Sequence, residues 1–118
     1  MARRKKTSTT LITTIKLLQM LSGKSRLWAD IAERIKKPRR LLAEVNLSKL
    51  SRYTSEGDVV VVPGKVLGSG DIRHKLTVAA LGFSKTAMLK LRKAGCRCLT
   101  IRELAEMNPE GSGVKIIG

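Results

Sequence analysis

Apolar side chains recur at helical spacing in two stretches near the start of the chain. Over residues 10–21 they return every three or four positions, and Gly23 follows as a stop signal. The second stretch has Ser25 as a candidate N-cap and is ended by Pro38. Its apolar residues share one helical face: Trp28, Ile31, Ala32 and Ile35. The pattern predicts two amphipathic helices.

After Pro38 the pattern becomes short and mixed, with strand and helix signals in alternation. The four valines at 59–62 indicate a buried strand, and alternation over 75–81 indicates another. Ser84 can cap a helix that ends at Gly95, and Thr100 with Glu103 matches a capping box. Further strands are predicted at 42–47, 97–99 and 114–117, with short helices at 48–53 and 101–107.

This order of elements predicts an α+β fold, in which two N-terminal helices precede short irregular strand–helix units. A chain of 118 residues is long enough for one compact domain, which we expect over 10–118. Residues 1–9 are basic and then rich in Ser and Thr, without apolar periodicity. We therefore expect them to form an extended basic tail.

Charge points to the class of partner. The chain has 24 Lys and Arg against 9 Asp and Glu, a formal net charge of +15. Residues 1–40 hold twelve basic and two acidic residues, so positive charge is concentrated there. Such an excess indicates a polyanion such as nucleic acid. Only three residues are aromatic, which argues against a reader of single strands that stacks bases on aromatic side chains.

The valine strand leads into a segment with three glycines and a lysine, V-V-P-G-K-V-L-G-S-G at 61–70. Glycine permits positive φ and close backbone approach, so the segment is predicted to be a loop that offers amides to phosphate. A P-loop would need a glycine at 59 and a hydroxyl at 66, and both are valines. The dinucleotide motif would need a glycine in place of Arg73. Glycines that serve only tight turns are the alternative.

No residue set suits catalysis or metal binding. His74 is the only histidine, and Cys96 with Cys98 offers two ligands where structural zinc takes four. We expect no enzyme activity, cofactor or small-molecule substrate. The longest aliphatic run is four residues, against the ~20 of a membrane helix, and no apolar signal core follows the basic start. A cytoplasmic protein with reduced cysteines and no membrane partner is expected.

Four segments in particular carry a family resemblance: W-A-D-I-A-E at 28–33, E-V-N-L-S-K-L at 44–50, the 61–70 segment, and V-A-A-L-G-F-S-K-T-A at 78–87. Shorter matches follow at 94–96, 101–104 and 108–109. With them the chain resembles the archaeal large-subunit ribosomal protein eighteen-e family. Eukaryotic large-subunit protein eighteen and, more distantly, bacterial protein fifteen are relatives of that family. The match covers essentially the whole chain, with Cys96 standing where a glycine is expected.

The resemblance implies a structural constituent of the large ribosomal subunit that binds and stabilises folded large-subunit ribosomal RNA, with neighbouring ribosomal proteins as further partners. It places the RNA contacts on two basic clusters, on the glycine–lysine segment and its continuation, and on one lysine at a helix start. These residues are Arg3, Arg4, Lys5, Lys6, Lys37, Arg39, Arg40, Gly64, Lys65, Gly68, Ser69, Gly70, Arg73, His74, Lys75 and Lys85.

Two rival functions are weighed against this one. A basic DNA-binding or chromatin-type protein would be expected to carry a recognition helix or a dimer seam, and neither is clear in the sequence. An RNA-modifying enzyme would need a cofactor pocket or an acid–base pair, for which the sequence has no candidate.

Overall fold

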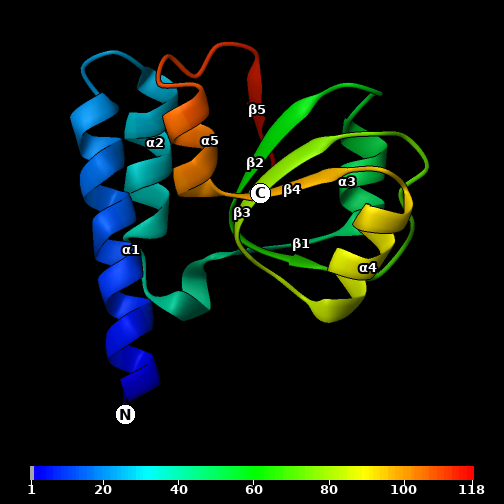
Figure 1. Cartoon of the computed structure of the whole chain (residues 1–118), viewed down its shortest axis with the longest axis horizontal. Coiled ribbons are helices and arrows are strands. Elements are labelled where there is room, and N and C mark those ends of the chain that lie inside the picture. The colour runs from blue at the N-terminus through cyan, green and yellow to red at the C-terminus, as the bar shows by residue number, and fades with distance from the viewer. Residues whose placement is uncertain (1) are drawn as a thin grey trace.

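The computed structural model describes residues 2–118, with the side chains of 11–38 and 40–118. Figure 1 shows two helices followed by strand–helix units, so the predicted fold class is confirmed. The elements are α1 (Ala2–Leu21), α2 (Arg26–Ile35), a short 3-10 helix (Arg39–Leu41), β1 (Ala43–Asn46), α3 (Leu47–Tyr53), β2 (Val59–Leu67), β3 (Thr77–Phe83), α4 (Lys85–Lys93), β4 (Arg97–Thr100), α5 (Ile101–Met107) and β5 (Val114–Ile116).

The strands of residues 2–118 form one parallel sheet in the order β1-β2-β3-β4, with β5 also paired to β2. β2 is the centre of this sheet. Its residues 59–61 pair with β5 and its residues 64–67 pair with β1, so β5 and β1 follow one another along one side of β2. A parallel sheet is normally covered on both faces. This explains why the central strands are continuous apolar runs.

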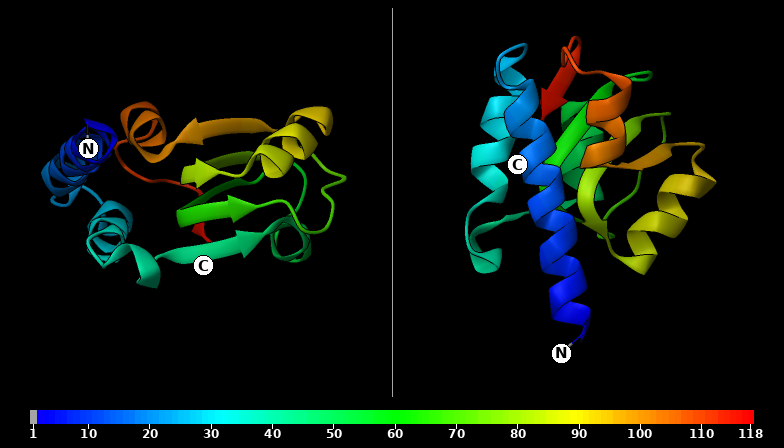
Figure 2. Two further views of the ribbon diagram at one scale, coloured as in Figure 1. Left: turned by 90° about the horizontal axis from the view of Figure 1, so that it is seen from below. Right: turned by 60° about the vertical axis from the view of Figure 1, so that its left-hand side comes forward.

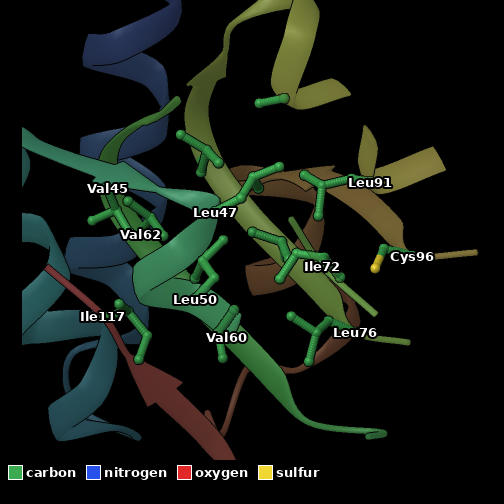
Figure 3. Packing of buried hydrophobic residues seen from close by; sticks show 14 residues of the cluster. Val45, Leu47, Leu50, Val60, Val62, Ile72, Leu76, Leu91, Cys96 and Ile117 are labelled. Carbon is green, nitrogen blue, oxygen red and sulfur yellow. The ribbon is translucent and has the colours of Figure 1, made fainter. Parts of the chain in front are cut away.

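Helices cover the two faces of the sheet in separate layers. α1, α2 and α5 pack on one face, where Val61, Ala79 and Leu99 contribute the sheet side of the core. α3 and α4 pack on the other face, against Val60 and its neighbours (Figure 3). Successive strand residues point to opposite faces, so a run such as the four valines supplies both cores at once.

Helix α2 anchors the first of these cores. All four apolar residues predicted on its inner face are buried. The largest is Trp28, whose Nε1–H donates to the carbonyl oxygen of Asn108 at 2.9 Å. Because the indole N–H keeps a partner, this wide side chain is buried without losing a hydrogen bond. The bond also ties α2 to the segment that follows α5.

The predicted caps of α4 and α5 are confirmed, whereas Ser25 precedes α2 without a side-chain capping hydrogen bond. Ser84 Oγ accepts the N–H of Ala87 at 3.1 Å, which starts α4, and Gly95 follows that helix with φ of +82°. Thr100 and Glu103 form the reciprocal capping box. The N–H of Glu103 donates to the Thr100 hydroxyl at 3.0 Å, and the N–H of Thr100 donates to the Glu103 carboxylate at 2.8 Å. These capping hydrogen bonds can be predicted from the sequence because the donor and the acceptor lie within four residues of each other in the chain.

Two predicted boundaries are wrong. Helix α1 begins at Ala2, so residues 2–9, expected to be extended, are helical. They include no glycine or proline, and Ala, Arg and Lys favour helix, so nothing local stops the helix before them. Strand β2 continues through Pro63 and Gly64 to Leu67, where a loop was expected. The register with β3 shifts between Val62 and Lys65, an irregularity that accommodates a proline without a backbone N–H.

Candidate nucleic-acid interface

A cleft of about 670 Å³ lies between the sheet and the helices α1 and α5. Its floor is formed by β2 and β3, and its walls by α1, the segment before β1, and the start of α5. Figure 2 (left) shows α1 end-on beside the strands of the sheet. The lining residues are Leu11, Thr14, Lys37, Arg40, Leu42, Ala43, Glu44, Gly64, Lys65, Ala80, Leu81, Gly82, Thr100, Ile101 and Arg102.

Four cationic side chains from separate segments surround this cleft: Lys37, Arg40, Lys65 and Arg102. All four are exposed. The first three form no ion pair with any residue that the structure describes. Arg102 pairs with Glu106 at 3.2 Å, an exposed pair of little strength. Glu44 is the register partner of Lys65 and the single carboxylate among the described lining residues. The cleft therefore has a net positive charge.

Gly64 belongs to the floor of the cleft and not to a loop. It pairs with Ala43 of β1, and a Cβ added to it would overlap the carbonyl oxygen of Ala43. Its φ is not positive. The prediction of a loop is thus wrong for 64–67, which are the last residues of strand β2. Here glycine is needed because it lets two parallel strands approach, which also brings Lys65 to the cleft.

The actual loop begins after Leu67, and its glycines face neighbouring segments. Gly70 has φ of +92°, and a Cβ on it would lie 2.7 Å from Ser48. A Cβ on Gly68 would lie 2.6 Å from Thr86. The N–H of Ser69 donates to Asn46 Oδ1 at 3.3 Å, and its carbonyl accepts the Ser48 N–H at 3.0 Å. These contacts make the loop rigid, with the Ser69 side chain left exposed.

Lys90 of α4 holds this loop, a role that the sequence did not reveal. Its ammonium donates to the carbonyl oxygens of Gly68 and Gly70, at 2.9 and 2.8 Å. Asp71 lies 3.8 Å from the same ammonium, and its side chain is three-quarters exposed. The two carbonyl bonds are therefore the important contacts of Lys90.

Replacing Lys90 by methionine is expected to lower the free energy of unfolding by about 1–2 kcal/mol, because two carbonyl groups lose a charged donor in a half-buried place. Urea unfolding followed by circular dichroism measures this effect. Lys93→Met is the matched control, since Lys93 is an exposed lysine of the same helix. An equal loss in the two variants would show that the carbonyl bonds contribute nothing.

Arg73, His74 and Lys75 continue the glycine–lysine segment in sequence, but the structure brings this continuation back toward the start of β2. The N–H of Lys75 donates to the Glu56 carboxylate at 3.2 Å, just before β2 begins. Lys65 lies six residues after Val59, the first residue of β2, which corresponds to about 20 Å at the rise per residue of a strand. His74 is half-buried, with its Nε2 2.8 Å from the Thr54 hydroxyl, while Arg73 and Lys75 are exposed.

The remaining predicted residues lie in two other places. Lys85 is exposed at the start of α4, on the sheet face opposite to α1. Residues 3–6 are in the first turns of α1, which precede the cleft-lining Leu11 and Thr14 and project beyond the other elements (Figure 2, right). Their side chains and that of Arg39 lie outside the described part of the structure. Sequence reasoning missed Arg102, although the predicted capping box at Thr100 placed the start of a helix there.

Two carboxylates and both thiols have shifted pKa values, each with a local cause. A hydrogen bond from the Lys115 ammonium and one from the Ser55 N–H lower the pKa of Asp58. Hydrogen bonds from the backbone and hydroxyl of Thr100 lower the pKa of Glu103. Burial raises the pKa of Cys96 and of Cys98, which are free thiols.

Within the described residues there is no group of three His, Cys, Asp or Glu side chains that could hold a metal ion. No described helix is both long and apolar enough to cross a membrane.

Comparisons with known proteins give the family. The protein-family model described as "Ribosomal protein 60S L18 and 50S L18e" matches residues 2–118. Large ribosomal subunit protein eL18 of Archaeoglobus fulgidus is 49% identical over 115 residues, 96% of this chain and 98% of the relative. The protein of the same name from Thermoplasma acidophilum is 55% identical over 93 residues, which are 79% of this chain and 78% of the relative. The protein of that name from Methanococcus maripaludis is 52% identical over 91 residues, which are 77% of this chain and 76% of the relative. The chain belongs to the L18 and L18e family of large-subunit ribosomal proteins.

Proposed function

We propose that this chain is a structural constituent of the large ribosomal subunit and binds folded large-subunit ribosomal RNA at its cationic cleft. The family supports the setting, since it is a family of ribosomal proteins and not of enzymes. The observation that carries the proposal is the convergence of Lys37, Arg40 and Lys65 on one cleft, with no ion pair to any described residue.

The cations of the cleft suit phosphate. The guanidinium groups of Arg40 and Arg102 are planar and can bind two phosphate oxygens at once, while Lys37 and Lys65 supply compact charge. Contacts of this kind position a protein on RNA and carry little sequence information. Binding then selects the shape of folded RNA, where strands approach closely and their phosphates need neutralising.

Two further basic regions extend the proposed contact. Residues 1–9 serve as a basic arm of the domain at 10–118, since α1 carries residues 3–6 beyond the cleft. Arg73, Lys75 and Lys85 are exposed and do not line the cleft, and they supply further RNA contacts. Neighbouring ribosomal proteins are further partners.

Affinity for large-subunit ribosomal RNA is expected to fall steeply with salt. If about 8 phosphates are neutralised, the logarithm of the association constant declines against the logarithm of salt concentration with a slope near −7. Filter binding between ~50 and ~300 mM KCl measures this slope. A slope near zero would contradict the proposal, because binding would then not depend on phosphate neutralisation.

Competition separates this function from that of a DNA-binding protein. At ~150 mM salt, folded ribosomal RNA is expected to displace the protein from duplex DNA of equal length. Equal affinity for the two would favour a chromatin-type role. Sedimentation adds a second check, since failure to migrate with the large subunit even at low salt would overturn the ribosomal assignment.

A further inference from the structure

We propose that the cleft binds one unpaired nucleotide of the RNA, with its phosphate on the cationic rim and its base on the floor. This inference rests on the proposed function and adds the kind of RNA element that the cleft takes. It concerns an RNA position where a base leaves the helical stack, as occurs in loops and bulges.

The shape of the site is the first argument. An intact duplex presents a convex surface of phosphates and sugars, which needs only an exposed array of cations. The cleft is instead concave, and its volume of about 670 Å³ falls in the range of pockets that take small ligands, roughly 300–1,000 Å³. A nucleotide turned out of a helix is the part of an RNA that enters such a hollow.

The lining is the second argument. Between the four cations the surface is largely apolar, with half-buried Leu11, Leu42 and Leu81 contributed by α1, the segment before β1, and β3. A site for phosphate alone has no use for such side chains. A nucleotide combines a charged phosphate with a flat base that is poorly hydrated on its faces, and so matches a cationic rim around an apolar floor.

Gly82 provides the third argument, by contrast with Gly64. A Cβ added to Gly82 meets no atom within 4 Å, and its φ is not positive. Neither crowding nor backbone conformation therefore requires glycine at this place in β3. Glycine weakens a strand, yet here it leaves the floor of the cleft without a side chain beside Lys65, its register partner in β2. An open floor is what an inserted base needs.

Titration of the ¹⁵N-labelled full chain with AMP or CMP tests the site directly. Either nucleotide is expected to shift the amide signals of Gly64, Gly82 and Arg102, whereas inorganic phosphate at the same concentration leaves Gly82 unchanged. If both nucleotides give only the shifts that phosphate gives, the base does not enter the cleft and the proposal is overturned.

Filling the floor gives the matching test on RNA. Gly82→Phe keeps every cation, and an aromatic residue suits a strand. It is expected to lower the affinity for large-subunit ribosomal RNA about tenfold, which is comparable with the loss of one recognised base. The dependence of affinity on salt concentration is expected to have the same slope as in the wild type, because no cation is removed. Gly23→Phe is the control and is expected to bind as the wild type does, because a Cβ on Gly23 also has open space around it and Gly23 does not line the cleft.

The outcomes separate the two proposals. Wild-type protein that fails to bind ribosomal RNA in a salt-sensitive way overturns the proposed function. Wild-type protein that binds normally, together with a folded Gly82→Phe variant of equal affinity, overturns only the insertion of a nucleotide. Circular dichroism establishes whether Gly82→Phe is folded, and if it is not, the titration of wild-type protein with nucleotides decides.

Discussion

Replacing Lys37, Lys65, Arg40 and Arg102 together by glutamine is expected to weaken binding to large-subunit ribosomal RNA by roughly 10²–10³-fold at ~0.15 M salt. Each cation that neutralises a phosphate releases a counterion, so losing four contacts also makes the salt slope shallower by about 3 to 4. Filter binding across a salt series measures the two effects together. Folding is expected to survive, because all four side chains are exposed.

The matched control removes the same charge elsewhere. Lys16, Lys24, Arg26 and Arg52 are exposed, and none of them lines the cleft. Glutamine at these four places likewise lowers the formal net charge from +15 by four, to +11. We expect a much smaller loss of affinity in this control. If the two quadruple variants lose affinity equally, overall charge and not the cleft determines binding, and the proposed site is wrong.

Gly64→Ala is expected to destabilise the fold by about 3 kcal/mol, a large part of the 5–15 kcal/mol that typically stabilises a domain. Its methyl group would overlap the Ala43 carbonyl, which is backbone and cannot rotate away. β1 must then move off β2, and the parallel pairing of 43–46 with 64–67 is lost or distorted. Chemical unfolding measures the loss, and hydrogen exchange should locate it at β1.

Gly82→Ala is the matched control for this prediction. Both glycines lie in paired strands of the sheet, but a Cβ at Gly82 has open space around it. Alanine there is expected to be neutral or slightly stabilising, because it lowers the conformational entropy of the unfolded chain. Equal destabilisation by the two substitutions would mean that glycine flexibility, and not strand contact, explains Gly64.

The local signals of the sequence predicted most of the elements. The buried face of α2, the cap at Ser84, the capping box at Thr100 and the final strand were all found from spacing of a few residues. These features depend on groups close together in the chain, whose preferences change little on folding. An error of local interpretation was made at 2–9, where polar composition was interpreted as an extended tail.

The candidate site was predicted only in part. Basic clusters indicated a polyanion, and Lys37, Arg40 and Lys65 were singled out, but the cleft that joins them was not. Arg73 was grouped with Lys65 because the two residues are near in sequence. The loop after β2 leads back toward the start of that strand, however, so residues 73–75 do not line the cleft. Distance along the chain is a poor guide wherever a strand of nine residues intervenes.

The sequence by itself determined the family, the positive charge, and the positions of caps and amphipathic faces, because these reside in residue identity and short spacing. Only the tertiary structure decided what Gly64 and Lys65 do. Pairing of β1 with the second half of β2 turned an expected loop into a strand. Long-range pairing also brought Lys37, Arg40 and Arg102 around Lys65. The contacts that build the cleft join segments that are far apart in the sequence, and a local pattern of residues cannot predict such contacts.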